Sequence, residues 1–178
     1  MIDLTPTMKK FVLHWGEMGS RWGINRTVAQ VHALLYISPE PLNAEDITET
    51  LSVARSNVST SLRELLTWGI VRTVPVLGDR RTHYKSLADV WELFRIVVQE
   101  RKQRELDPTF VTVRECLEES GRATAADKHF RERLGALLEF FEAISAWYAD
   151  MDKLPTRTAR RLIKLGGKVQ KMLGFTSR

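Results

Sequence analysis

The amino-acid sequence predicts a mainly α-helical protein that carries two closely spaced helices followed by a small two-stranded β-hairpin. Three observations support this fold class. Apolar residues recur at helical spacing over most of the chain. Two candidate helix N-caps, Asn43 and Ser52, stand nine positions apart. Directly after Gly69 the pattern changes to β-branched residues on both sides of a Gly-Asp pair.

Two helices are predicted ahead of this pair. The residues Phe11, Trp15, Met18 and Trp22 follow one another at steps of four, three and four, which makes one helical stripe, and Gly23 ends it. Asn25 is a suitable cap for a second helix with the sequence RTVAQVHALLYIS. Two prolines in the SPEPLN stretch then break the chain.

The closely spaced pair covers about residues 43–50 and 52–68. Asn43 caps the first helix, and acidic residues near its first turn match the helix dipole. We expect Ser52 to cap the second helix and Gly69 to follow its last turn. Two helices joined by so short a turn are typical of a helix-turn-helix.

The hairpin comes next. Residues 70–76 and 82–86 have the composition of two short strands, and residues 77–81 are the expected loop between them. Pro75 cannot donate a hydrogen bond to a neighbouring strand, so it indicates an edge strand or an exposed hairpin.

The rest of the chain is predicted to be helical. Trp91, Phe94, Val98 and Arg101 lie at helical spacing, Pro108 starts a new segment, and residues 121–127 form a hinge or loop. The most regular pattern is a series of apolar residues at alternating steps of four and three, as in a coiled-coil seam: Phe130, Leu134, Leu137, Phe141, Ile144, Tyr148 and Met151. Residues 153–178 contain eight Lys or Arg and no acid.

Composition narrows the class of partner. The 178 residues carry a formal net charge of +5 with a pI of about 9.6, which favours an anionic partner. A single cysteine excludes an internal disulfide, so we expect a reducing, cytoplasmic location. No apolar run approaches the roughly 20 residues of a membrane span, and we expect neither a secretory signal nor a membrane partner.

The second helix of the pair has an unusual polar face. Short polar side chains and arginines crowd its first turns, although Ser, Asn and Thr weaken helix interiors. These residue types suit DNA, because Asn pairs with adenine edges, Arg with guanine edges, and Ser or Thr with bases or phosphates. A solvated helix face is the alternative. The candidate DNA-contacting residues of this helix are Arg55, Ser56, Asn57, Ser59, Thr60 and Arg63.

The hairpin adds positive charge beside that helix. Residues 53–85 contain six Lys or Arg and two acids, a local charge of +4. An arginine on a thin loop can enter the minor groove, and Asp79 can hold Arg81 for that role through a bidentate pair. A solubilising turn is the alternative. The candidate DNA-contacting residues here are Arg80, Arg81, His83 and Lys85.

The order of helix-turn-helix, Asp-Arg-Arg hairpin and flanking helices resembles the MarR-type winged helix-turn-helix regulators. The segments GINRTVAQVHALLYIS, VARSNVSTSLRELLTWGIVRTV and GDRRTHYKSLADVWELFRIVVQERKQRELDP are closest to the GbsR-like branch. The resemblance implies a winged-helix domain over residues 24–87 and a helical dimerisation region over 1–23 and 88–152. Residues 153–178 are expected to form a basic C-terminal helix or tail, for which the resemblance gives no role. It also implies a homodimer that binds double-stranded DNA at a palindromic operator.

Other chemistry has less support. No His or Cys pair has metal-ligand spacing, and no phosphate-binding loop or catalytic constellation is visible, so we expect no metal, no cofactor and no enzyme activity. A small-molecule effector remains an expectation, with the GbsR-like resemblance pointing to choline-type osmolytes. Its candidate aromatic cage is Trp15, Trp22, Trp91 and Trp147. The alternative function is a winged-helix module that docks an acidic protein or RNA.

Overall fold

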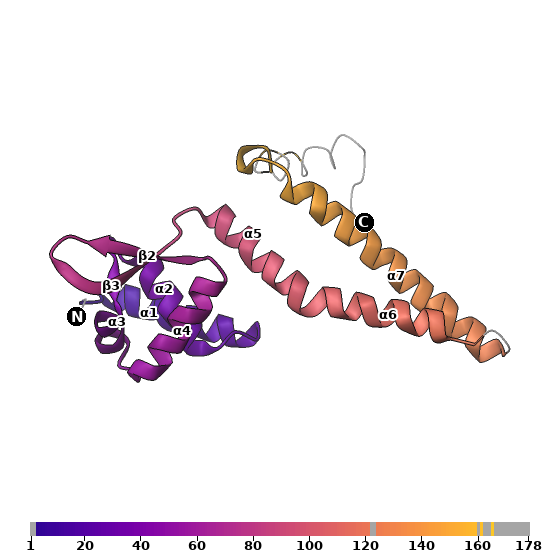
Figure 1. Cartoon of the computed structure of the whole chain (residues 1–178), viewed down its shortest axis with the longest axis horizontal. Helices are drawn as coiled ribbons and strands as arrows, with labels where there is room; N and C mark the ends of the chain where they lie inside the picture. Colours follow the sequence, from indigo (N-terminus) through magenta and orange to yellow (C-terminus); the bar gives the residue numbers. More distant parts are fainter. Residues whose placement is uncertain (1–2, 122–123, 160, 162–164, 166–178) are drawn as a thin grey trace. The chain divides into compact units, whose positions relative to one another are not determined.

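A computed structural model describes residues 3–121, 124–159, 161 and 165 of the chain. These residues belong to two compact units, residues 1–97 and 98–178. The first unit contains four complete helices, a small sheet and the first turns of a fifth helix, and the second unit consists of long helices. The course of the chain is drawn in Figure 1.

Helices α1 (Pro6–Arg21) and α2 (Arg26–Ile37) open the first unit. Asn25 caps α2 by accepting a hydrogen bond from the Thr27 N–H at 2.8 Å, which confirms the predicted cap. The two helices pack closely because α1 presents glycine to α2. A Cβ added to Gly19 would lie 2.5 Å from the Cβ of Ala29, so a larger residue does not fit without movement.

Helix α3 (Ala44–Leu51) begins at the predicted cap. The Asn43 side chain accepts from the backbone N–H groups of Glu45 and Asp46 at 2.9 and 3.0 Å. The carboxylate of Asp46 accepts in turn from the Asn43 N–H at 3.4 Å, which completes a capping box. The start of α3 is therefore fixed by reciprocal hydrogen bonds.

The predicted start of the next helix is wrong. Helix α4 covers Arg55–Thr67, and its N-cap is Ala54 rather than Ser52. Ser52 instead ends α3 in the left-handed conformation, with φ of 52°, and its N–H bonds to the Thr48 carbonyl. The turn therefore takes three residues, and Val53, expected inside the helix, packs from this turn against the core.

The sheet has three strands in the order β1-β3-β2, formed by β1 (Leu42–Asn43), β2 (Val71–Val76) and β3 (Asp79–Ser86). The sequence did not indicate β1, which has two residues and pairs antiparallel with β3. Pro75 lies on the edge strand β2 beside a register irregularity, in agreement with the prediction.

The predicted loop of the hairpin is also wrong in length. The turn consists of Leu77 and Gly78 alone, and Asp79 already pairs with Val76. Gly78 adopts φ of 82°, which glycine tolerates without the strain that a side chain would bring, and so a two-residue connection suffices. Arg80 and Arg81 consequently lie on β3, behind the tip, and Leu77 at the tip is fully exposed.

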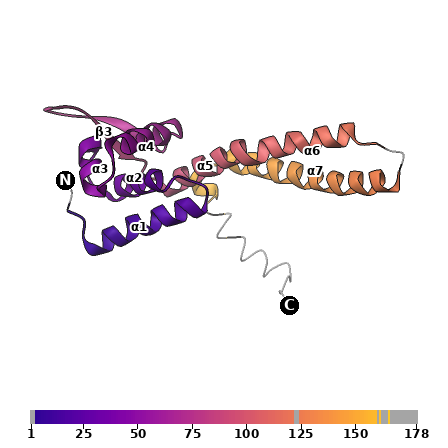
Figure 2. The ribbon, with the colours of Figure 1, turned by 90° about the horizontal axis from the view of Figure 1, so that it is seen from below.

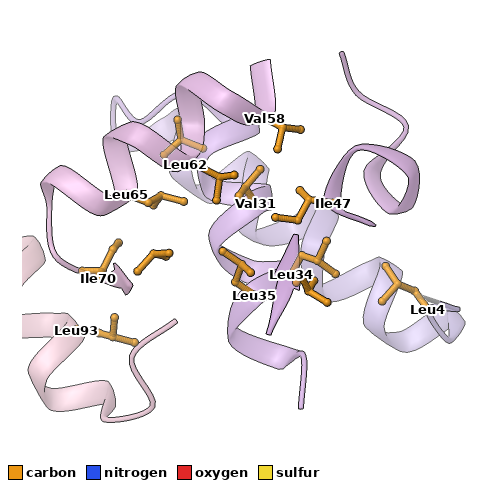
Figure 3. Close-up of a cluster of buried hydrophobic side chains, with 13 residues drawn as sticks. Leu4, Val31, Leu34, Leu35, Ile47, Val58, Leu62, Leu65, Ile70 and Leu93 are labelled. Carbon is orange, nitrogen blue, oxygen red and sulfur yellow. The ribbon is translucent and has the colours of Figure 1, made fainter. Parts of the chain in front are cut away.

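The core of the first unit lies between α2, α3, α4 and the sheet (Figure 3). Val31 and Ile47 have no exposed surface, and α4 contributes its apolar stripe of Val58, Leu62 and Leu65. Burial of one such side chain contributes about 1.5–3 kcal/mol, so this stripe fixes which face of α4 points outward. The buried apolar cluster consists of Leu4, Val28, Val31, Leu34, Leu35, Leu42, Ile47, Val58, Leu62, Leu65, Ile70, Val71 and Leu93.

A helix with a wide turn leads into the second unit. Helix α5 (Val90–Arg101) continues through a π-helical segment, Lys102–Leu106, into α6 (Asp107–Glu119). The sequence predicted a new segment at Pro108, and α6 begins at Asp107 with Pro108 in its first turn, although the chain stays helical through the π-helical segment before it. Proline lacks an N–H donor and crowds the preceding turn, and a π-turn is a known way of interrupting the regular hydrogen-bond ladder.

Helix α7 (Ala125–Asp152) runs beside α6 (Figure 2). Thr124 caps it with a capping box to Asp127, and these residues fall within the predicted loop. Arg131 closes the hairpin, because its guanidinium donates to the Leu117 carbonyl at 2.7 Å and to the Ser120 hydroxyl at 2.6 Å. The last turn of α6 is thus tied to the first turns of α7.

The predicted seam of α7 divides between two faces. Leu134, Phe141, Tyr148 and Met151 are half-buried, while Phe130, Leu137 and Ile144 are exposed by 40–45%. Tyr148 also donates a hydrogen bond to the Gln99 side chain at 3.2 Å. The exposed members continue a separate stripe that includes Phe140 and Trp147, exposed by 56% and 60%.

Beyond Lys153 the structure describes residues 154–159, 161 and 165, and most of the predicted basic tail lies outside the described residues. Within the part of the chain that is described, no helix has both the length and the apolarity to cross a membrane.

Candidate nucleic-acid interface

The first turns of α4 present the predicted DNA-contacting side chains to solvent. Val58, Ser61 and Leu62 are buried, and the helical period therefore directs Ser59 and Thr60 outward. Ala54 gives no side-chain hydrogen bond to the first turn, which leaves backbone N–H groups there able to donate to an anion. The exposed residues on this part of α4 are Arg55, Ser56, Asn57, Ser59, Thr60 and Arg63.

Arg81 is held on the wing, the hairpin of β2 and β3, by the residue expected to hold it. Its Nε–H donates to both carboxylate oxygens of Asp79 at 3.0 Å, and Nη2 forms a further ion pair with Oδ2. The Asp79 carboxylate also accepts from the Arg81 backbone N–H at 2.9 Å. These bonds stabilise both charges, so the pKa of Asp79 is lowered and the pKa of Arg81 is raised.

A second carboxylate joins the wing to α4. Glu45 Oε1 accepts from Arg55 Nη1 at 2.9 Å, and Glu45 Oε2 accepts from Arg81 Nη1 at 3.1 Å. Hydrogen bonds from Arg55 and then Arg81 lower the pKa of Glu45. This role of Glu45 could not be predicted from the sequence, because its partners lie 10 and 36 positions away and Glu45 matches an ordinary first-turn acid.

His83 is not on the surface, which corrects its predicted role as a direct DNA contact. The residue is 5% exposed, and its Nδ1 lies 3.0 Å from the Arg81 carbonyl oxygen. Its Nε2 lies 3.4 Å from Asp79 Oδ2. His83 therefore supports the residues that carry the exposed arginine. Its place in the sheet explains the error, since His83 lies between Asn43 of β1 and Val74 of β2, whereas Arg81 lies closer to the turn of the hairpin.

The other cations of the wing remain available to solvent. Arg80 is exposed, and Lys85 is half-buried with its Nζ 3.4 Å from the Pro39 carbonyl oxygen. Together with Arg55, Arg63 and Arg81 they make the outer surface of α4 and β3 cationic.

The tryptophans do not form one site within either unit. Trp15 packs between Phe11 and His32, with ring centroids 5.5 and 6.4 Å away, and is 43% exposed. Trp22 and Trp91 belong to the same unit, whereas Trp147 belongs to the second unit. A cage containing all four depends on the placement of the two units or of a second chain, and it stays a prediction.

Comparison with known proteins identifies the domain. A model of the MarR family matches residues 22–82. The HTH-type transcriptional regulator MmpR5 of Mycobacterium tuberculosis (strain ATCC 25618 / H37Rv) is 27% identical over 81 residues, which are 45% of this chain and 49% of that protein. The matched segment thus spans about half the length of this curated relative.

The fold has solved counterparts. The crystal structure of a transcriptional regulator matches 82% of this chain and 99% of its own, with 20% identity and a TM-score of 0.54. The S. aureus MepR–DNA complex is also similar, with 13% identity, coverage of 98% and 100%, and a TM-score of 0.35. Neither the family model nor MmpR5 distinguishes the GbsR-like branch, which stays a prediction. Residues 22–82 therefore match the MarR family, and the fold is that of a solved transcriptional regulator.

Proposed function

We propose that the protein is a homodimeric transcriptional regulator that reads a palindromic operator with α4 in the major groove and the wing in the minor groove. The observation that supports this most directly is the shared carboxylate of Glu45. Because it binds Arg55 at the start of α4 and Arg81 on the wing, both cationic elements lie at one surface of the first unit. Two cationic elements on one surface can contact the major groove and the adjacent minor groove of a single DNA duplex.

The exposed polar side chains of α4 and the wing suit three different parts of DNA, namely base edges, the minor groove and phosphates. Asn57 lies in the first turns of α4, where a recognition helix contacts bases, and its amide can pair with an adenine edge. Arg81 is aimed from β3 and suits the electronegative minor groove. Arg63 and Lys85 lie farther from the start of α4 and from the wing tip, and they suit phosphates.

The exposed apolar stripe of α7 supports a dimer. Phe130, Leu137 and Ile144 repeat every seven residues, and Phe140 and Trp147 repeat at the same interval beside them. All five are exposed by 40–60% in a single chain. A heptad stripe of large apolar side chains is the pattern that two helices bury against one another.

Fluorescence anisotropy with labelled nucleic acids tests the proposal. The wild-type protein is titrated against duplexes from the region upstream of its own gene, against shuffled duplexes of equal length, and against RNA of the same sequence. We expect one upstream duplex to bind at least tenfold more tightly than its shuffled version, and binding to weaken steeply as salt rises.

The same titration separates the alternative. Tighter binding to single-stranded RNA than to any duplex, or equal weak binding to all of them, would support a winged-helix module that docks RNA or an acidic protein. Clear preference for one DNA duplex would exclude this alternative function.

A further inference from the structure

Glu45 is placed more rigidly than an ordinary surface acid. Its backbone N–H bonds to the Asn43 side chain at 2.9 Å, and Asn43 is 2% exposed and pairs with His83 of β3 in the sheet. The start of α3 is thus fixed both to the wing and, by the short turn after α3, to α4. Because Glu45 lies at the start of α3, its carboxylate can fix the distance between Arg55 and Arg81, both of which it contacts.

Glu45 joins the side chains of both arginines to α3. Asp79, the other acid on Arg81, is itself at the start of β3 and moves with the wing. Among the described residues, Glu45 is the one carboxylate that pairs with Arg55, and it is also the one that links Arg81 to a different element. Loss of Glu45 therefore removes the side-chain link between Arg55 and Arg81 and leaves the packing of α4 and the wing in place.

The bonds of Arg81 leave it able to reach DNA. A guanidinium has five N–H groups in a fixed plane. The bonds to Asp79 use Nε–H and one N–H of Nη2, and the bond to Glu45 uses one N–H of Nη1. These three bonds leave one N–H on Nη1 and one on Nη2 for a further acceptor. Glu45 therefore orients the guanidinium of Arg81 without using all of its N–H donors.

We infer that Glu45 is a positioning residue for operator specificity, which sets the spacing between the major-groove contact of Arg55 and the minor-groove contact of Arg81. This rests on the proposed function. The carboxylate lies on a surface that meets phosphates, so it weakens binding to all DNA by charge repulsion. It raises discrimination because a rigid pair of contacts accepts fewer groove geometries than two independent arginines.

Two substitutions separate geometry from charge. Glu45→Asp keeps the charge but shortens the side chain by one methylene, so one carboxylate no longer spans both arginines. We expect its affinity for random DNA to equal that of the wild type, while its preference for the operator falls about three- to tenfold, the range of two exposed ion pairs. Glu45→Gln removes the charge, and we expect it to bind random DNA more tightly and also to lose preference.

The duplex for this measurement is the one that the wild-type protein selects from a random library. Glu17→Gln is the matched control, because it removes the same charge from an exposed position on α1. It should keep the wild-type ratio of operator to random affinity. An unchanged ratio in Glu45→Asp would overturn the positioning role, and an unchanged ratio in both Glu45 variants would leave Glu45 without any role in specificity.

A readout without DNA keeps this inference distinct from the proposed function. In the ¹⁵N NMR spectrum of the free protein, both Glu45 variants should shift the Nε–H signals of Arg55 and Arg81, and Glu17→Gln should shift neither. If those signals do not respond, the connection itself is absent and the inference fails even when DNA binding is confirmed. If they respond but the wild type prefers no duplex, the proposed function fails and the specificity role fails with it.

Discussion

At the scale of single residues, we predict two kinds of DNA contact, one from α4 and one from β3. Asn57 is exposed in the first turns of the helix, whereas Lys85 lies on β3 with its stem half-buried. An amide reads a base edge through two directional hydrogen bonds. An ammonium group is a point charge that binds any phosphate, and so it carries no sequence information.

The substitution Asn57→Ala should cost about 1–3 kcal/mol of binding free energy on the operator and relax the preference at one base pair in each half-site. Lys85→Ala should weaken operator and random DNA by the same factor and lower the salt slope by about one. Anisotropy titrations at several salt concentrations measure both effects. Wild-type binding by Asn57→Ala on operator and random DNA alike would show that this residue does not read bases.

A second residue-scale prediction concerns His32, which is buried between Trp15 and Tyr36 with its Nε2 3.3 Å from the Ser86 hydroxyl. Burial lowers the pKa of His32 to about 4, whereas an unfolded histidine titrates near 6.5. Between these values the unfolded chain binds a proton that the folded chain excludes. The free energy of unfolding should therefore fall as pH falls from about 6.5 to 4, by up to about 1.4 kcal/mol per pH unit.

Urea unfolding at a series of pH values checks this prediction. His32→Gln keeps a polar side chain but cannot take up the proton, so its stability should change less across the same window. His14→Gln, at an exposed position on α1, is the control and should keep the wild-type dependence. Identical pH profiles for His32→Gln and the wild type would show that His32 does not cause the acid sensitivity.

At the scale of elements, the contact between α1 and α2 depends on Gly19. Alanine at this position would bring two Cβ atoms to 2.5 Å, which overpacks the helix contact by about 1–3 kcal/mol. The better helix propensity of alanine returns about 1 kcal/mol. We expect Gly19→Ala to lower the melting temperature. Gly135 of α7 has no atom within 4 Å of such a Cβ, so Gly135→Ala should raise it.

Circular dichroism melts of the two variants give the comparison. The prediction fails if both substitutions stabilise the protein, because α1 would then be able to move away from α2 at no cost.

The elements that the sequence predicted well are those with local chemistry. The caps at Asn25 and Asn43 are confirmed, since each depends on residues within one turn. The pairing of Asp79 with Arg81 is also local. These features define the helix pair and the wing without any knowledge of the tertiary structure.

The features that were missed depend on contacts between distant segments. Strand β1 forms because Leu42 meets Tyr84, and the two-residue strand has no pattern of its own. Ser52 is a good N-cap by composition, but the packing of Val53 into the core makes it the end of α3 instead. The bridge from Glu45 to Arg55 and Arg81 requires the folded domain.

At the scale of the whole molecule, we predict that the stripe on α7 holds two chains together. Leu137→Glu with Ile144→Glu would place two charges in the apolar contact and should give a monomer of 20.5 kDa in sedimentation at low micromolar concentration. Ala146→Glu, on an exposed face of α7 away from the stripe, should stay dimeric. A monomeric wild type would contradict the dimer, and a dimeric double variant would show that another surface forms it.

A two-fold symmetric dimer that binds DNA through α4 and the wing should prefer a DNA site with the same two-fold symmetry. The most direct measurement is selection of duplexes by the wild-type protein from a random library, followed by sequencing. We expect an inverted repeat whose half-sites lie about 10 base pairs apart, or a multiple of this interval, centre to centre. Failure to enrich any duplex, or enrichment of a site without two-fold symmetry, would contradict the account of a homodimeric operator-binding regulator.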